Sequence, residues 1–449
     1  MGEEELTALA AEAYVYGLPL VSGLSMADAF LRQGFGPLAA APFNHFSHAD
    51  RSIAPDDTRF VSVDTDLIYS IAQLDLSAGP VRLHVPDTGG AYYVLQFVDA
   101  WTNNFAYLGS RGGGTDAGEW LVVPPGWAGT VHDEVRGVID APTSVVTVIG
   151  RNVYDGPGDL PRVRALQQEL TLTHLGPEAE HTGLPEPEPG VPELLRFFER
   201  LRVWMAGFPP AAADRAYQDR FQPLGLLEEG VSPYVTAGPV LVRALTQGLT
   251  RGKGRVEEAS GPAQGADRAA PGAWRMNPHL FDYNLDHFGV GTLASPQWKL
   301  PDRTASYLVR AVAARTGLWG SHGYESVYAY TFQDSAGRRL DGSHDYVLRF
   351  RQPPPVAAFW SVTLYDVPGH RLVANTAGRY SVGDRTPGIV YGADGSLTLY
   401  LRREPPADPD EAANWLPAPD GEFRPVLRLY LPDQDVLDGR YVIPAIERR

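Results

Sequence analysis

The fold class is decided by two neighbouring segments, Tyr346-Val-Leu-Arg-Phe350 and Ala358-Phe-Trp-Ser-Val-Thr-Leu-Tyr-Asp366, which a Pro-rich connection joins. Both alternate as β-strands do, because successive side chains of a strand point to opposite faces of the sheet. One face of the second segment is apolar and carries Trp360, Val362 and Leu364. The opposite face is amphipathic and carries Phe359, Ser361, Thr363 and Tyr365. Such a face can form a core, an interface or a ligand platform.

The same alternation recurs toward the C-terminus. Leucine occupies every second position in two runs, Leu397, Leu399 and Leu401, and Leu427, Leu429 and Leu431. Turn-forming residues such as Ala393-Asp-Gly-Ser396 separate the β runs. These patterns predict a C-terminal antiparallel β-sandwich, jelly-roll-like, over residues 321–449.

A second group of β patterns lies nearer the N-terminus. Val81, Leu83 and Val85 alternate with polar residues, and residues 92–101 form a long β run. Residues 145–149 are almost entirely apolar, as in a strand that is covered on both faces. We therefore predict an N-terminal antiparallel β-sandwich over residues 51–155.

The remaining regions have helical periodicity. Residues 1–50 are predicted as an N-terminal helical segment, in which Gly17 and Pro19 are expected to break the helix over residues 4–33. Residues 156–320 are predicted as a helical connecting region. Its expected helices cover 160–175, 193–205, 240–249 and 303–315, and its expected loose stretches cover 176–190 and 252–272. The predicted class is α+β, mainly β with helical additions: two sandwiches joined by a helical segment.

Composition excludes several kinds of chemistry. The 449 residues include no cysteine, which excludes disulfides, thiolate nucleophiles, zinc–thiolate sites and iron–sulfur clusters. The net charge of −16 argues against nucleic acid or an anionic membrane as the main partner. The acidic N-terminus does not resemble a secretory signal, and we find no apolar run near the ~20 residues of a membrane span, so a cytoplasmic location is expected. We find no phosphate loop, dinucleotide fingerprint or nucleophile elbow, so no cofactor is expected.

Motifs along nearly the whole chain resemble a two-domain bacterial family. Its halves are known as domain of unknown function 1254 and domain of unknown function 1214. The N-terminal resemblance rests on Ala13-Tyr-Val-Tyr-Gly-Leu-Pro19, Asp66-Leu-Ile-Tyr-Ser70, Val98-Asp-Ala-Trp-Thr-Asn-Asn-Phe105, Gly109-Ser-Arg111 and Ile149-Gly-Arg151. The C-terminal resemblance rests on Pro354-Pro-Val-Ala-Ala-Phe-Trp-Ser-Val-Thr-Leu-Tyr365, Asn375, Arg379-Tyr-Ser381, Asp394-Gly-Ser396, Asn414-Trp-Leu-Pro-Ala-Pro419 and Arg428-Leu-Tyr430. The resemblance implies two β-sandwich-type domains with helices between and around them, and it implies little about a reaction.

One segment departs from the family pattern. Relatives usually read Asn-x-Asp-Thr-Leu-Tyr-Ser where this chain reads Asp64-Thr-Asp-Leu-Ile-Tyr-Ser70, so Asp64 replaces Asn and Leu67 replaces Thr. If these positions touch a ligand, the substrate or the chemistry differs from that of the relatives. Many relatives also carry export signals, and we expect none in this chain.

The first candidate cluster is Asp64, Asp66 and Tyr69. On a strand the two aspartates would project to the same face. Close carboxylates can divide general acid and base roles, and they are also compatible with a divalent cation. The alternative is a solvated strand end or an aspartate that orders a turn.

The second candidate cluster is Asp99, Trp101, Asn103 and Arg111, which follows a long apolar strand. Such residues can hydrogen-bond a sugar or polyol while the indole stacks on an apolar face. The alternative is that they stabilise a domain interface by satisfying backbone groups.

The third candidate cluster combines Tyr365, Arg379, Arg428 and Tyr430, with Trp360 shaping the pocket. Arginine offers a bidentate fork for an anion, and tyrosine can donate a proton or stabilise an oxyanion. The alternative is a sheet face packed on the helical segment or on a second subunit, which leaves a homo-oligomer open.

Two weaker signals complete the set. Asn414 and Trp415 could cover a pocket, but anchoring of their loop to the sandwich is the favoured interpretation. His45 and His48, with Asp50, have a spacing compatible with a metal, but further ligands would be needed.

Together these patterns favour an enzyme that acts on a small polar or amphipathic molecule. The pocket is expected between the two β domains, with Asp64 or Asp66 as acid/base and Asp99 supporting it. Hydrolysis, elimination, isomerisation or a biosynthetic cyclisation without a redox cofactor would fit. The alternatives are a non-catalytic small-molecule or carbohydrate-binding protein and a scaffold with a large apolar interface.

Overall fold

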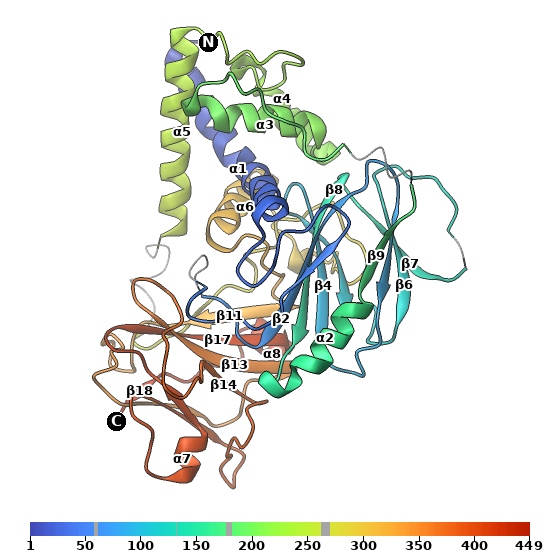
Figure 1. Ribbon diagram of the computed structural model, residues 1–449. Helices are drawn as coiled ribbons and strands as arrows, with labels where there is room; N and C mark the ends of the chain where they lie inside the picture. Colours follow the sequence, from blue (N-terminus) through green and yellow to red (C-terminus); the bar gives the residue numbers. More distant parts are fainter. Residues whose placement is uncertain (58–61, 132, 177–181, 262–269) are drawn as a thin grey trace.

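The chain forms two β-sandwiches and one helical unit. The computed structural model describes residues 1–57, 62–131, 133–176, 182–261 and 270–449. In Figure 1 most of the long helices lie at the top, the N-terminal sandwich at the right and the C-terminal sandwich at the lower left. The chain begins among the helices and ends in the C-terminal sandwich.

The N-terminal sandwich packs a five-stranded sheet against a four-stranded sheet. The first has the order β1 (Phe46–His48), β2 (Leu67–Asp75), β8 (Val145–Val153), β4 (Tyr93–Asp99), β5 (Asn104–Gly109). The second has the order β7 (Val135–Asp140), β6 (Gly118–Val123), β3 (Val81–Val85), β9 (Thr171–His174). Strand β8 is buried along its whole length, because the second sheet covers one face and apolar side chains from two helices cover the other. This confirms the prediction of a doubly covered strand.

The C-terminal sandwich has the same two-sheet construction. Its five-stranded sheet has the order β10 (Arg275–Met276), β11 (Ser326–Tyr330), β17 (Phe423–Pro432), β13 (Val356–Asp366), β14 (Ser381–Gly383). Its four-stranded sheet has the order β16 (Trp415–Pro417), β15 (Leu397–Arg402), β12 (Tyr346–Phe350), β18 (Glu447–Arg448). Trp360, Val362 and Leu364 of β13 lie in the core between the sheets, as the alternation predicts.

The amphipathic face of β13 forms the seam with the N-terminal sandwich. Phe359 stacks on Tyr430 with ring centroids 4.3 Å apart, and both rings pack against Tyr92 of the N-terminal sandwich. Ser361 and Tyr365 of this face donate hydrogen bonds across the same seam, and Thr363 accepts one from Arg428 of the neighbouring strand β17. Of the three uses open to this face, the structure shows an interface between domains.

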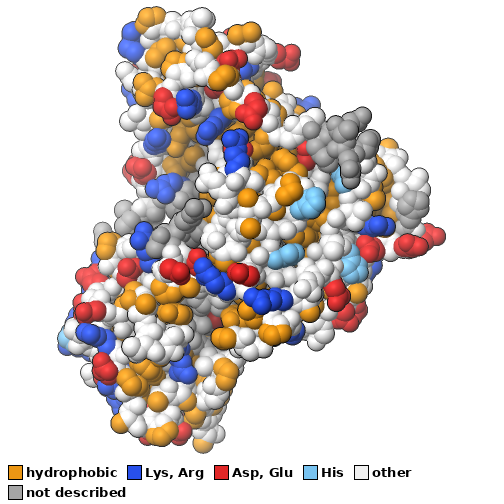
Figure 2. Space-filling model, viewed as in Figure 1, with side chains coloured by type: hydrophobic (Ala, Val, Ile, Leu, Met, Phe, Trp, Pro, Cys, Tyr) orange, Lys and Arg blue, Asp and Glu red, His pale blue; other side chains and the backbone are white. Residues whose placement is uncertain are grey.

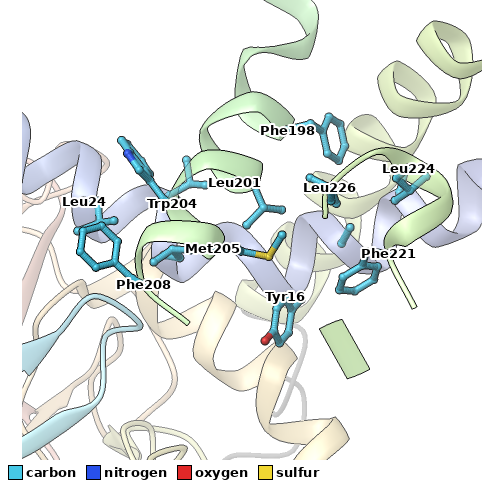
Figure 3. Close-up of a cluster of buried hydrophobic side chains, with 14 of the residues drawn as sticks. Tyr16, Leu24, Phe198, Leu201, Trp204, Met205, Phe208, Phe221, Leu224 and Leu226 are labelled. Carbon is cyan, nitrogen blue, oxygen red and sulfur yellow. The ribbon is translucent and has the colours of Figure 1, made fainter. Parts of the chain in front are cut away.

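The helical unit has its own apolar core. Its helices are α1 (Glu3–Gln33), α3 (Arg196–Gly207), α4 (Arg215–Asp219), α5 (Pro239–Ser260) and α6 (Arg303–Gly317). Figure 3 shows part of this core, where Tyr16 and Leu24 of α1 face Leu201 and Met205 of α3. Helix α2 (Leu160–Glu169) covers the N-terminal sandwich, and α7 (Pro409–Ala413) and α8 (Gln434–Leu437) belong to the C-terminal one. Short 3₁₀ segments are Pro157–Asp159, Glu193–Leu195, Ala212–Asp214, Gln222–Leu224 and Pro296–Trp298.

The predicted break in the first helix is wrong, because α1 continues through Gly17 and Pro19. Leu201 of α3 packs on the bare Cα of Gly17, where a Cβ would lie only 2.3 Å from Leu201 Cδ1. Gly17 and Pro19 are both buried among the neighbouring helices. This packing offsets the backbone hydrogen bond that Pro19 cannot donate, so tertiary contacts override the local preference.

The predicted loose stretch from residue 252 is also wrong over its first part, because α5 extends to Ser260. Its glycines allow close contact with α1: a Cβ on Gly248 would lie 2.4 Å from Ala10 Cβ. Arg243 and Arg251 of α5 pair with Glu3 and Glu4 of α1 at 2.7 and 2.6 Å. Residues 262–269 of the predicted stretch lie outside the described residues.

The fold prediction of two β-sandwiches with a helical segment between them is confirmed. Two of the strand pairs, β6 with β7 and β15 with β16, are parallel. The predicted helix over 160–175 is too long, because it ends at Glu169 and the chain then enters β9. Strand β9 pairs with β3 and β10 with β11, so both sandwiches recruit strands from the expected connecting region.

Helix α1 is long and apolar enough to span a membrane by length and composition, contrary to the expectation from the sequence. However, 61% of its most apolar window is buried inside the protein, which is typical of a core helix. On the face shown in Figure 2, acidic and basic side chains are interspersed over both the helical and the β regions.

Candidate active site

The turn formed by Asp64, Thr65 and Asp66 lies at the seam of the two sandwiches, immediately before strand β2. Because β2 begins at Leu67, the two aspartates lie in a turn, not on a strand, so the shared face that a strand would give them does not form. Asp64 Oδ1 accepts the backbone N–H of Asp66 at 2.8 Å, which holds the turn. Asp64 lines an apolar cavity and Asp66 lines a separate polar groove.

The apolar cavity has a volume of about 240 Å³ and lies between α1, the N-terminal five-stranded sheet and the C-terminal five-stranded sheet. Its walls are mainly apolar and include Phe30 of α1, Phe35, Ile71 of β2, Ile149 of β8 and Trp319. Its polar lining residues are Ser62, Asp64, Tyr69, Arg151, Tyr328 and Arg428. A mostly apolar cavity with a few convergent polar groups is the usual form of a small-molecule site.

Asp64 is held by residues of the C-terminal sandwich. Tyr430 donates its hydroxyl hydrogen to Asp64 Oδ2, and Arg428 Nε lies 3.4 Å from the same oxygen. Asp64 and Arg428 are 5% and 2% exposed, so this ion pair is buried. The contact joins residues more than 360 positions apart in the chain, and it shows that Arg428 and Tyr430 point from one face of β17.

Arg428 also orders the loop that carries Asp64. Its terminal nitrogens donate to the Ser62 carbonyl oxygen at 2.7 Å, to the Tyr365 hydroxyl at 2.6 Å and to Thr363 Oγ1 at 3.0 Å. The Tyr365 hydroxyl in turn donates to the Val63 carbonyl oxygen. Arg428 and Tyr365 therefore position the loop. Asp64 lines the cavity together with the phenols of Tyr69 and Tyr328.

The phenols around Asp64 remain protonated at neutral pH. Burial raises the pKa of Tyr69, and the negative charge of Asp64 raises it further. The same two causes raise the pKa of Tyr430. The Tyr69 hydroxyl, which lines the cavity, can therefore donate a hydrogen bond to an oxygen that becomes negative during a reaction, whereas the Tyr430 hydroxyl already donates to Asp64.

Asp66 lies on the other side of the turn, in a polar groove of about 560 Å³. Its carboxyl group accepts hydrogen bonds from the hydroxyls of Ser361 and Ser381, both in the C-terminal sandwich. Burial, and next the nearby charge of Asp64, raise the pKa of Asp66 to about 6. A carboxyl group with a raised pKa in a cleft marks a candidate functional residue.

This raised pKa predicts a pH-dependent difference between the wild type and Asp66→Asn. Between the ordinary value of 3.8 and about 6 the folded state holds the Asp66 proton more tightly than the unfolded state does, so the stabilisation from Asp66 is lost as pH rises through this window. Raising the pH from about 4 to about 7 should cost the wild type roughly 2–3 kcal/mol more than D66N. Urea denaturation at both pH values measures this difference. Asp420→Asn, on the surface, is the control, and a pH-independent difference between wild type and D66N would contradict the assignment.

The second predicted cluster lies elsewhere. The side-chain amide of Asn103 donates a hydrogen bond to the Asp99 carboxylate at 2.9 Å. Both residues and Trp101 line a cavity of about 130 Å³ where the N-terminal sandwich meets the helical unit. The Trp101 indole is 3% exposed and donates its N–H to the Phe208 carbonyl oxygen at 2.9 Å. The structure therefore places Asp99 away from Asp64 and Asp66, and the indole packs between domains instead of facing a solvent-filled groove.

The other predicted residues stabilise the fold around the seam. Arg111 pairs with Glu325 at 2.9 Å and links the two sandwiches. Arg379 borders the polar groove, but its terminal nitrogen Nη1 donates to the carbonyl oxygens of Ala412, Ala413 and Trp415. Trp360 also borders that groove, while its ring lies in the C-terminal core.

The two weaker signals have structural roles. Asn414 bonds to the backbone of Val390 and Thr398, and the Trp415 indole donates to the Arg402 carbonyl oxygen, which confirms the anchoring interpretation. His48 lies on strand β1, where its Nδ1 is 2.9 Å from Ser70 Oγ. Across the described ranges, no group of three or more His, Asp or Glu side chains is arranged to hold a metal ion.

The sequence reasoning did not select Arg151 and Tyr328, which line the cavity beside Asp64. Arg151 belongs to the Ile149-Gly-Arg151 motif, so its position in that motif was an available signal. Tyr328 is adjacent to Arg428, because Tyr328 of β11 pairs in register with Arg428 of β17. The position of Tyr328 beside Arg428 follows only from the pairing of these two strands, which the sequence does not show.

The comparisons with known proteins agree with this architecture. The family model "Protein of unknown function (DUF1254)" matches residues 43–174, and "Protein of unknown function (DUF1214)" matches residues 325–434. The chain belongs to the two-domain family in which DUF1254 is followed by DUF1214. The first match ends with strand β9, and the second extends from just before β11 to just after β17.

Two solved structures are similar. The VPA0106 protein from Vibrio parahaemolyticus has 23% identity and a TM-score of 0.74, with 99% of this chain and all of that chain covered. A protein from Burkholderia cenocepacia has 12% identity and a TM-score of 0.46, with 97% and 87% covered. The first likeness supports the fold alone. The search of curated proteins gives no match.

Proposed function

We propose that this protein is an enzyme that acts on a small amphipathic molecule by acid/base chemistry in the apolar cavity. The proposal rests on one observation: a buried carboxylate, Asp64, lies among phenols and arginines in a cavity whose walls are otherwise apolar. The cavity is large enough for a ring and a short side chain, because an engineered apolar cavity of about 150 Å³ already binds benzene.

In this proposal Asp64 is the general base. Its carboxylate removes a proton from a carbon or hydroxyl group of the substrate or, in a hydrolysis, from the attacking water. Tyr69, which also lines the cavity, donates a hydrogen bond to the oxygen on which negative charge develops. Arg428 and Tyr430 keep Asp64 in place through the contacts described above, so they are positioning residues. The chemistry fits an elimination, an isomerisation, a cyclisation or a hydrolysis.

The test is a comparison of the wild type with Asp64→Asn. Each protein is incubated with a library of small amphipathic compounds, and mass spectrometry follows which compounds are converted. We expect the wild type to convert at least one compound and D64N to convert it roughly 100-fold more slowly, because general acid/base groups contribute about that much. Asp420→Asn is the matched control, since Asp420 is exposed and far from the seam. Equal turnover by D64N and wild type would refute the role of Asp64.

The second candidate function is non-catalytic binding of a small molecule. It is favoured by the fully bonded, buried setting of Arg428, which gives the cavity a rigid polar side. A compound that stabilises the protein against heat but is recovered unchanged after incubation would support this candidate over the enzyme.

A further inference from the structure

Arg151 is a cation of the apolar cavity that has no carboxylate partner in the described parts of the chain. It extends from β8 into the cavity lining and is 8% exposed. Its Nη1 donates to Gln96 Oε1 at 2.6 Å and its Nη2 to the Trp319 carbonyl oxygen at 3.3 Å, and both acceptors are neutral. No hydrogen bond joins its Nε to any residue that the structure describes.

The buried Arg428 and the half-buried Arg111, both at the seam, differ from Arg151 in this respect. Arg428 is paired with Asp64 at 3.4 Å, and Arg111 is paired with Glu325 at 2.9 Å. Burying a charge without a partner is costly, and a partner of opposite charge with suitable geometry reduces that cost. A ligand anion in the cavity would supply the partner that the chain does not.

The surroundings of Arg151 indicate the kind of anion. The Tyr69 ring lies 5.8 Å from the guanidinium carbon, so a phenol is available beside the cation. One unpaired cation matches one negative charge, which favours a carboxylate over a phosphate monoester with nearly two charges. The guanidinium fork and a carboxylate are also complementary in shape.

The walls indicate the rest of the ligand. Phe30, Phe35, Leu38 and Ile149 are apolar and offer no hydrogen bonds to a sugar or polyol. Trp319, whose carbonyl oxygen holds Arg151, has a φ of 64°, a conformation that bulky residues seldom adopt. Strained backbone of this kind tends to occur at ligand sites.

We propose that the cavity binds a small monocarboxylate with an apolar body, such as an aryl or branched-alkyl acid, whose carboxylate lies on Arg151. The ligand's apolar part occupies the space between α1 and the sheets. This inference rests on the proposed function only for the location of the site, and it does not require Asp64 to catalyse a reaction.

The experiment uses isothermal titration calorimetry with the full chain. The probes are a series of aryl and branched-alkyl carboxylates from benzoate to 4-phenylbutyrate, each paired with its primary amide. The amide has nearly the same shape but no charge. We expect at least one carboxylate to bind the wild type about tenfold or more tightly than its amide, as charge-assisted bidentate contacts allow.

Two variants locate the anion. Arg151→Gln should remove the preference for the carboxylate and leave amide affinity within about twofold, whereas Arg379→Gln, at the polar groove, should keep the preference. If R151Q does not fold, the carboxylate–amide comparison in the wild type still decides. Equal affinity for acid and amide, a preference that survives R151Q, or no binding by any carboxylate would overturn the inference.

The outcome is separable from that of the proposed function. Carboxylates that bind through Arg151, together with equal turnover by D64N and wild type in the compound library, would support this inference and refute the role of Asp64. Turnover that requires Asp64 but is insensitive to R151Q, with no preference for the acids, would support the enzyme and refute this inference.

Discussion

Replacing Arg428 by methionine is expected to lower the free energy of unfolding by about 3–5 kcal/mol, the usual cost of breaking a buried ion pair from one side. Arg428→Met leaves the 5%-exposed Asp64 without its cation. It also removes the donors to Thr363 Oγ1 and to the Ser62 carbonyl oxygen. These groups and the Tyr365 hydroxyl, which also accepts from Arg428, therefore lose a partner at once, on both sides of the seam.

Urea denaturation measures this loss, and two further variants interpret it. Asp64→Asn combined with Arg428→Met removes the stranded charge, so the double variant should regain part of the stability that R428M loses. Arg403→Met removes an exposed pair with Asp420 and should change stability little. If R428M were as stable as R403M, the ion pair with Asp64 would not hold the seam together.

Replacing Trp360 by alanine is expected to destabilise the protein by about 3–5 kcal/mol, as for other buried tryptophans. Trp360 is 1% exposed and packs against Phe350 with ring centroids 5.3 Å apart in the C-terminal core. Truncation leaves a large void between the two sheets, because the surrounding strands can relax only in part.

This substitution also separates packing from function. Trp360 borders the polar groove but not the apolar cavity, so Trp360→Ala should leave carboxylate affinity within about threefold wherever the protein is still folded. Denaturation and calorimetry on the same sample measure both quantities. Trp127→Ala, on the loop between β6 and β7, is the control and should cost much less, since Trp127 lies outside the hydrophobic cores. A stable W360A, or one that loses affinity while folded, would contradict this division.

Much of the fold follows from local patterns. The alternation at Trp360, Val362 and Leu364 identified the inward face of β13, and the apolar run over residues 145–149 identified a doubly covered strand. Both predictions follow directly from the spacing of apolar side chains along the chain. Helix boundaries were harder, because Pro19 in α1 and Gly248 in α5 act through contacts with other helices. Local sequence patterns alone predict that proline and glycine interrupt a helix.

The candidate site was predicted in part. Asp64, Tyr69, Arg428 and Tyr430 are brought together, although Tyr430 acts through its contact with Asp64. Asp66 faces the polar groove, and Asp99 lies at the junction with the helical unit. Arg151 was not selected, although its place in the Ile149-Gly-Arg151 motif was a signal, and Tyr328 was not selected because only its pairing with Arg428 across strands distinguishes it.

By itself the sequence determined which residue types are present and which face of each strand is apolar, because those properties depend on neighbours one or two positions away. It thereby set the α+β class, the two sandwiches and the absence of thiol chemistry. Tertiary structure alone decided that Asp64 meets Arg428 and Tyr430, that Asp66 faces a different hollow, and that Arg151 lacks a carboxylate partner among the described residues. These relations join positions up to 366 apart, and the packing of whole sheets against one another, not any local preference, sets the distances between them.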